Sequence, residues 1–305
     1  MAHHFTREVK RIKTALADRT FNWFAYGTVS MFMMVCLYPL LLMLSSSFST
    51  EKEIIQTGYT LWPKGFTLDT YAYLFRSGGD WILSSYLVTI FVTVVGTVCS
   101  MLITAMLAYT LSSKKLKYRN KISLYCYFTM LFNGGLVPWY ILIVNYYHLT
   151  NTIAALIVPY LLNVFFLFVM RSYFDTIPEP LLESARMDGA TELYIFAKIM
   201  IPIALPGIAT ISLFYAIQYW NDWWLSLLFI RDDSLFPLQY RLYNLLSNTQ
   251  ALASNMSQHA ADKVAVPTVT VKAAITMVTI GPILLVFPFI QRFFVKGLMI
   301  GAVKG

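Results

Sequence analysis

The chain has 305 residues, of which 58% are hydrophobic and only 12% are charged, and its mean hydropathy is +0.61. About a quarter of the residues of a typical soluble domain are charged, so this composition excludes an ordinary soluble protein. A net charge of +8 would suit nucleic acid as a partner, but the basic residues gather in short segments between apolar runs. Because the positive-inside rule produces that pattern in membrane proteins, we exclude nucleic-acid binding.

The N-terminal segment, residues 1–20, is polar and basic and is expected to be a cytoplasmic tail. It is followed by Phe21–Leu44, which contains no charged residue. The apolar core of a signal peptide is shorter, roughly 7–15 residues, so Phe21–Leu44 is predicted to be a retained first membrane span.

Five further spans are predicted, because about 20 apolar residues cross a bilayer. The uncharged stretch 122–170, apart from His148, is long enough for two of them, divided by polar residues at 147–152. The spans are Trp81–Leu111, Ile122–Val144, Ile153–Met170, Ile199–Ile230 and Ala273–Ile290. Gly134-Gly135, followed by Pro138, predicts a break in the third span, which either packs against protein or lines a path. The predicted fold class is an all-α polytopic membrane protein, with residues 21–305 as one transmembrane domain.

The distribution of Lys and Arg orients these spans. With the N-terminus inside, the inner segments hold 16 of these residues and the outer segments hold 6. The positive-inside rule therefore places both termini in the cytoplasm and residues 45–80 and 231–268 outside. It also places residues 171–198, between the fourth and fifth spans, inside.

This inner segment, residues 171–198, has a net charge of −2. A loop lying on anionic lipid would be basic, so a protein partner is favoured over the membrane surface. Gly189 predicts a bend between two short helices, the first opened by Pro178 and Pro180. We expect the loop to present three charged side chains to water: Arg186, Asp188 and Glu192.

Residues 183–202 resemble the cytoplasmic coupling loop of ABC importer permeases, whose pattern is E-A-A-x3-G-x9-I-x-L-P. The matches are Glu183, Ala185, Gly189, Ile199 and Pro202, with Ser184 and Ile201 as conservative departures. Further resemblance lies in Trp62-Pro63, Asn133-Gly134-Gly135, Trp220-Asn221 and the ending Gly301-Ala302-Val303-Lys304-Gly305. Together these features resemble the second permease subunit of carbohydrate-type (maltose-type) importers, of the branch handling complex oligosaccharides.

The resemblance implies a type I permease fold with six transmembrane helices in a bacterial cell membrane, and no catalysis by this chain. It implies four kinds of partner: a homologous second permease subunit, a dimer of ATPase subunits, an extracytoplasmic sugar-binding protein and an oligosaccharide substrate. The chain contains no phosphate-binding loop, so ATP and Mg are expected on the ATPase subunits alone. The residues expected to contact the ATPase are Glu183, Ser184, Ala185, Asp188, Gly189, Ala190 and Pro202.

Polar residues inside spans are candidates for the substrate path, because such groups usually face a cavity or another helix. The candidates, with neighbouring aromatic residues that could stack on sugar rings, are Asn133, Trp139, Tyr140, Asn163, Gln218, Trp220 and Asn221. Tyr215 and Tyr219 are further stacking candidates. The competing interpretation is hydrogen bonding between helices and an aromatic belt at the outer interface, which is favoured for Trp223 and Trp224.

The alternative function is an ion-gradient-driven secondary transporter of a polar solute. Such a protein is expected to carry buried carboxylates near the middle of the membrane and often inverted repeats. Asp222 is the nearest candidate, but it lies toward an interface. The histidines do not have metal-ligand spacing, so no catalytic or metal site is expected.

Overall fold

The computed structural model describes residues 16–256 and 269–284. Every regular element in these ranges is a helix, as predicted. The basic residues 1–15, the last part of the predicted sixth span and the ending at residues 301–305 lie outside the described residues.

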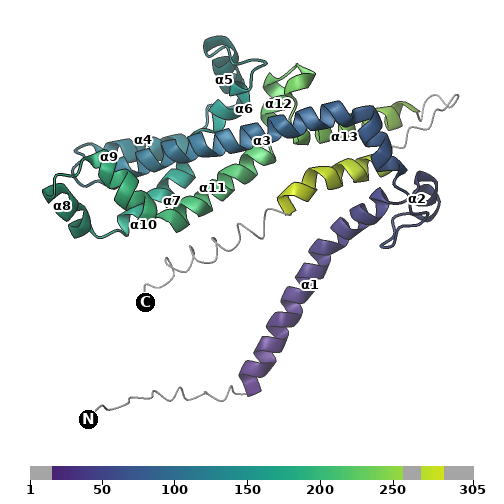
Figure 1. Cartoon of the computed structure of the whole chain (residues 1–305), viewed down its shortest axis with the longest axis horizontal. Coiled ribbons are helices and arrows are strands. Elements are labelled where there is room, and N and C mark those ends of the chain that lie inside the picture. The colour runs from purple at the N-terminus through teal and green to yellow at the C-terminus, as the bar shows by residue number, and fades with distance from the viewer. Residues whose placement is uncertain (1–15, 257–268, 285–305) are drawn as a thin grey trace.

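Within residues 16–256 and 269–284, two helices are long and apolar enough to cross a membrane without a break. They are α1 (Leu16–Ser47) and α3 (Asp69–Ser112), and they contain the predicted first and second spans. Helix α3 is the central element, because α7 (Val164–Asp175) and α11 (Leu205–Trp220) both pack along it (Figure 1).

The third, fourth and fifth predicted spans are bent, whereas the sequence predicted a break only in the third. In the third, α4 (Arg119–Leu131) meets α5 (Leu136–Ile141) and the π-helix η1 (Leu142–Tyr146) at 113°. In the fourth, α6 (Ala154–Ile157) and η2 (Val158–Tyr160) meet α7 at 54°. In the fifth, the segment formed by α9 (Glu192–Ile195), the π-helix η3 (Phe196–Met200) and α10 (Ile201–Ile203) meets α11 at 83°.

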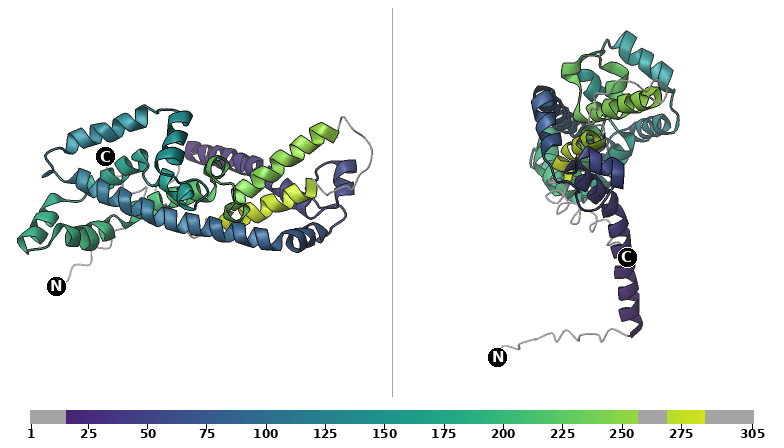
Figure 2. Two further views of the ribbon diagram at one scale, coloured as in Figure 1. Left: turned by 90° about the horizontal axis from the view of Figure 1, so that it is seen from above. Right: turned by 90° about the vertical axis from the view of Figure 1, so that its right-hand side faces the viewer.

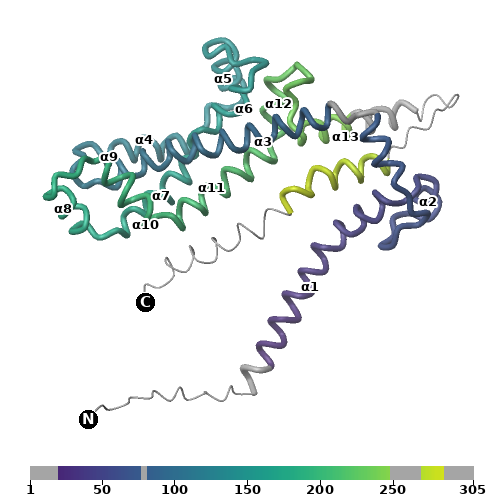
Figure 3. Tube along the Cα trace, in the orientation of Figure 1, coloured from purple at the N-terminus to yellow at the C-terminus, as the bar shows by residue number. Residues whose placement is uncertain are grey.

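The remaining elements are short helices that connect the spans, together with α13 and the described part of the sixth span. Helix α8 (Glu179–Met187) precedes α9, and α2 (Glu51–Thr57) lies between α1 and α3. After α11 come α12 (Trp224–Phe229), η4 (Asp233–Leu235) and α13 (Leu238–Met256). The helix Val269–Leu284 is the described part of the sixth span. The α2 and α8 segments lie at opposite ends of the bundle (Figure 3).

Local sequence explains where the bent spans break. Gly135 has a φ of 88°, in a region that suits glycine, and its N–H donates to the Asn133 side chain at 2.9 Å, so the predicted break in the third span is confirmed. Asn163 starts α7 by accepting hydrogen bonds from Phe165 N and Phe166 N at 3.0 and 3.4 Å. The turn at Ala204 lies between Pro202 and Pro206, whose rings disfavour a continuous helix.

Hydroxyl groups from α3 and α11 satisfy the backbone at the break in the fourth span. The Tyr219 hydroxyl donates to the carbonyl of Ile157 at 3.1 Å, and the Tyr215 hydroxyl accepts from Asn163 N at 3.0 Å. These two hydroxyls also pair with Ser100 and Thr104 of α3, at 2.8 and 2.7 Å. A non-helical backbone inside a membrane needs such partners, so this polar cluster explains how the broken span is stable.

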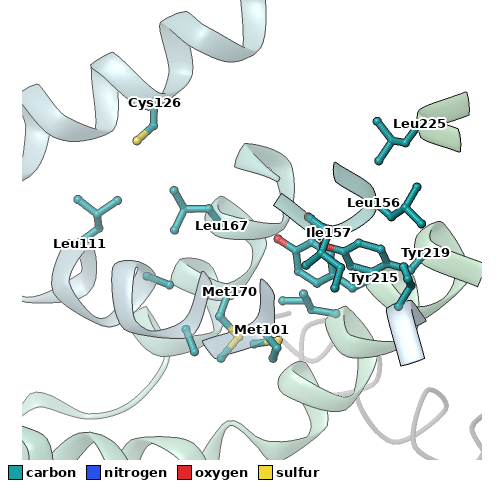
Figure 4. Close-up of a cluster of buried hydrophobic side chains, with 14 of the residues drawn as sticks. Met101, Leu111, Cys126, Leu156, Ile157, Leu167, Met170, Tyr215, Tyr219 and Leu225 are labelled. Atoms are coloured by element: carbon teal, nitrogen blue, oxygen red, sulfur yellow. Dashed lines mark hydrogen bonds between the residues drawn. The ribbon is translucent and has the colours of Figure 1, made fainter. Parts of the chain in front are cut away.

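Both tyrosine rings lie within the apolar core that joins α3, α7 and α11 (Figure 4). Tyr215 and Tyr219 are 0% and 2% exposed, respectively. Of the two interpretations, the structure therefore supports hydrogen bonding between helices for these tyrosines and not stacking on sugar, because both rings and hydroxyls are already occupied by core contacts.

Helix α1 diverges from the bundle in both Figure 1 and the right-hand view of Figure 2. No residue of its apolar part up to Leu44 is buried, and Cys36 is exposed. Its attachment is at the Ser47 end, where the Tyr71 hydroxyl donates to Ser47 Oγ at 2.9 Å and Thr67 N donates to the Phe48 carbonyl at 2.9 Å. An apolar span with so little cover inside its own chain must contact lipid or another protein.

Candidate coupling loop and substrate path

The loop between the fourth and fifth spans consists of two short helices, α8 and α9, that meet at a glycine. Gly189 has a φ of 81°, and beyond it Thr191 caps α9 by accepting from Tyr194 N at 3.3 Å. L side chains rarely adopt that φ, so glycine fixes the bend at low energetic cost. The predicted pair of helices joined at Gly189 is confirmed.

The outward side of this bend carries small and acidic residues and is accessible to solvent. Glu183, Ser184 and Asp188 are exposed, and the neighbouring Met187 is 88% exposed. A hollow of about 570 Å³ lies beside them. The residues expected to contact the ATPase that line it are Ala185, Asp188, Gly189 and Ala190. An exposed apolar side chain beside a small-residue hollow suits close contact with another protein.

Arg186 lies differently from the sequence expectation. Its side chain is only 17% exposed, and its Nε donates to Glu192 Oε1 at 2.9 Å, with a longer contact from Nη2 to Oε2 at 3.4 Å. Arg186 thus turns inward across the bend and pairs with Glu192, instead of facing water. Asp188 is exposed, as expected.

Glu192 receives a second donor from the transmembrane core. The hydroxyl of Tyr109, on α3, donates to Glu192 Oε2. The hydrogen bonds from Arg186 and then from Tyr109 lower the pKa of Glu192, and the bond to Glu192 raises the pKa of Arg186. Both groups are therefore charged at neutral pH and largely neutralise each other, which leaves Glu183 and Asp188 to give the exposed bend its acidic character.

Two further ion pairs lie near the loop. Lys114 pairs with Glu179, which joins the end of α3 to the start of α8 and lowers the pKa of Glu179. Arg171 pairs with Asp175 at 3.6 Å within α7. Pro202, the last residue of the coupling motif, is exposed next to the 83° turn that leads into α11. The loop therefore continues directly into the fifth span.

Three substrate-path candidates lie together at the far end of α11. Asn221 is exposed, and its Oδ1 accepts from Gln239 Nε2 at 3.0 Å. Trp220 lines a cavity of about 240 Å³ between α3, α11 and the helix Val269–Leu284, and its indole nitrogen is buried without a partner in the described part of the chain. Gln218, three residues before Asn221 and within α11, is half-buried.

The other four candidates have different surroundings. Trp139 and Tyr140 pack on the ring of Phe229, with centroids 5.3 and 5.6 Å away. Asn163 caps α7, and Asn133 lies in the exposed break after α4. The seven residues thus do not form one cluster in this chain, and their contact with substrate remains a prediction.

The structure adds two contacts that the sequence did not predict. One is the Tyr109–Glu192 hydrogen bond, between residues 83 positions apart, for which no sequence pattern exists. The other involves Asp222, whose carboxylate accepts from the Tyr160 hydroxyl at 2.9 Å and from Leu225 N at 3.2 Å. Asp222 therefore holds the first turn of α12 in place, a structural role that weakens its candidacy as the carboxylate of an ion-driven transporter. Among the described residues, no group of His, Cys, Asp or Glu could hold a metal ion.

Comparison with known proteins agrees with this architecture. The chain is 39% identical over 290 residues to the polygalacturonan/rhamnogalacturonan transport system permease protein YtcP of Bacillus subtilis, covering 95% of this chain and 100% of that protein. It is also 39% identical over 273 residues to the Protein LplC of the same organism, covering 89% of this chain and 90% of LplC.

A solved structure has the same fold. This is one chain in the crystal structure of a bacterial ABC transporter involved in the import of the acidic polysaccharide alginate, with a TM-score of 0.79 and 29% identity over 92% of this chain and 98% of that chain. Residues 85–300 match the family described as the binding-protein-dependent transport system inner membrane component. The chain belongs to this family of membrane permeases, not to a family of enzymes.

Proposed function

We propose that this chain is a permease subunit of an ATP-driven oligosaccharide importer, in which it forms half of the translocation path. The family and the sugar-transport names of similar proteins support this function. The observation that carries it is the bent, acidic α8–α9 loop, which continues into α11 through the turn at Pro202. A loop built in this way can carry the movement of a separate motor into the membrane.

The expected motor is a dimer of ATPase subunits that bind ATP and Mg beneath residues 178–198. When the ATPases close on ATP, the residues around Gly189 move with them, and the turn at Ala204 passes that movement to α11. The path then alternates between facing outside and facing inside, as in other rigid-body transport transitions. A sugar-binding protein delivers the oligosaccharide to the outer face.

A homologous second permease completes the path. The exposed α1 and the exposed side-chain amide of Asn133, in the break of the third span, support such a partner. A polar group left without partners in hydrocarbon costs up to several kcal/mol, so a covering subunit would stabilise the chain.

The proposed location is the bacterial cell membrane, with both termini in the cytoplasm. The separation of α2 and α8 to opposite ends of α3 supports this topology, because it puts the first outer loop and the coupling loop on opposite sides of a membrane.

The function is tested by purifying the chain with its co-expressed partners and assaying ATP-dependent uptake in liposomes. The assay uses oligogalacturonides and neutral arabino-oligosaccharides. Glu183→Lys and Gly189→Pro should insert normally but lose ATPase association and uptake, because they reverse a charge or remove the bend. Asp69→Lys, at an exposed acidic residue distant from the loop, is the control. Uptake by the isolated chain on a proton or sodium gradient would support the secondary transporter instead.

A further inference from the structure

The coupling loop has covalent connections to only two of the helices that it must move. It follows α7 in the chain, and it continues through α10 into α11. Helix α3 lies between these helices and contacts both, but it ends at Ser112, 67 positions before the first loop helix begins at Glu179. Movement of the loop therefore reaches α3 only through side-chain contacts.

Two polar contacts join the loop to α3. The Lys114–Glu179 pair is solvent-exposed, with side chains 70% and 38% exposed, and such pairs contribute little. In the Tyr109–Glu192 contact the Glu192 side chain is 58% exposed, but Tyr109 is half-buried, because its ring packs on Phe196 of η3 at 5.4 Å and on Phe174 of α7 at 6.3 Å. Both contacts are hydrogen bonds to a carboxylate, but the Tyr109 ring is held by this packing whereas the Lys114 side chain extends into solvent, so Tyr109 is the better link.

The opposite half of α3 is joined to the outer segment that follows α12. Thr89 Oγ1 accepts from Leu238 N at 2.9 Å, and Ser84 Oγ donates to the Ser234 carbonyl at 3.2 Å. A weaker contact runs from Arg241 Nε to Ser85 Oγ at 3.4 Å. One helix, α3, thus connects the coupling loop at one end with η4 and α13 toward the other.

We propose that Tyr109 is a positioning residue that makes α3 a second lever of the importer, moving with the coupling loop and transmitting its movement to residues 233–241. This inference rests on the proposed function. Glu192 is the loop residue that holds Tyr109, and Arg186 holds Glu192 in place. The contact operates in both directions, because a coupling free energy between two sites is reciprocal.

Tyr109→Phe tests the lever, because it removes one hydroxyl and keeps the ring against Phe174 and Phe196. The complete complex is reconstituted in liposomes with its binding protein, and oligosaccharide uptake and ATP hydrolysis are measured together. We expect normal assembly and basal ATP hydrolysis, but a fall of about 5-fold or more in oligosaccharide transported per ATP, in line with typical coupling energies. A purely structural role would lower assembly and basal hydrolysis and leave this ratio unchanged.

Two matched variants complete the experiment. Tyr125→Phe makes the same chemical change at an exposed tyrosine of α4, and Lys114→Gln breaks the weaker link between the loop and α3. Both should keep the wild-type ratio. A wild-type ratio in Tyr109→Phe, or an equal loss in Lys114→Gln, would overturn the inference while uptake by the wild-type complex still supports the proposed function. Absence of uptake by the wild-type complex would instead contradict the proposed function itself.

Discussion

Gly96 shows how closely the helices approach each other in the middle of the bundle. A Cβ added there would lie 2.7 Å from the ring of Tyr219, which is fully buried. Small residues allow helices to pack closely inside membranes, and here the close approach is also what brings the Tyr219 hydroxyl to Ser100.

Gly96→Ala is therefore expected to destabilise the chain by about 1–3 kcal/mol, the usual range for overpacking a core. The measurement is the midpoint of thermal unfolding in detergent. Gly27→Ala is the control, because a Cβ at Gly27 meets nothing within 4 Å. An equal midpoint for Gly96→Ala and wild type would mean that the Tyr219 ring moves aside freely.

Glu192 makes the coupling loop sensitive to acid. Its pKa is lowered from its usual value of 4.5 by Arg186 and Tyr109, with Lys115 adding a smaller effect. A carboxyl with a lowered pKa in the folded chain adds stability above its unfolded pKa, and that contribution is lost as the pH falls through the lower folded value.

The thermal midpoint of wild type should therefore exceed that of Glu192→Gln at neutral pH, and the difference should shrink progressively below pH 4.5. Asp69→Gln, at an exposed carboxylate, provides a comparison without this contact. A difference between wild type and Glu192→Gln that stays constant down to the lowest pH would show that the ionised carboxylate is not the stabilising form.

At the scale of the elements, the broken spans depend on caps as much as on apolar length. Asn163 starts α7 inside the predicted fourth span, where its side chain satisfies two backbone N–H groups. Ser retains a side-chain acceptor at this position, whereas Ala does not.

Asn163→Ala should lower the free energy of unfolding by about 1 kcal/mol, and Asn163→Ser should lose less. Thermal unfolding of the two variants, side by side, provides the measurement. If Asn163 instead acts mainly on substrate, both variants would keep wild-type stability and lose uptake.

The sequence predicted these elements unevenly, for physical reasons. The glycines at 189 and 135 predicted the bend and the break, because a backbone position with a positive φ favours glycine and is therefore visible in the sequence. Apolar length located the spans but not the 54° bend of the fourth span, which depends on how Tyr215 and Tyr219 satisfy a broken backbone. It also did not locate the 83° turn of the fifth span, which lies between Pro202 and Pro206. The inward turn of Arg186 and the Tyr109–Glu192 contact arise only from tertiary packing, so no local sequence pattern predicts them.

At the scale of the whole molecule, the topology follows from the two ends of α3. Tyr59 lies in the first outer loop and is 56% exposed, while Met187 is in the coupling loop and 88% exposed. Opposite ends of a membrane-spanning helix must be reached by reagents from opposite sides.

In a chain whose native cysteines are replaced, Tyr59→Cys should react with a membrane-impermeant maleimide on intact cells. Met187→Cys should react only after permeabilisation. The reverse pattern of labelling would contradict the cytoplasmic position of the coupling loop.

The whole chain also lacks what it needs to work alone. Helix α1 is uncovered along its apolar length, and Asn133 exposes an amide group in the break of the third span, where hydrocarbon would offer it no partner. The sequence also contains no phosphate-binding loop, so the energy that moves the coupling loop must come from another subunit.

Reconstituted by itself, the chain should therefore accumulate no oligosaccharide, with or without ATP or an ion gradient. Adding the second permease and the ATPase dimer should restore ATP-dependent uptake, and the same additions should reduce the labelling of α1 by a lipid-soluble carbene photoreagent, because the apolar part of α1 is uncovered in its own chain. If uptake is restored and the labelling of α1 is unchanged, the chain needs its partners for energy and path, while lipid, and not the second permease, covers α1.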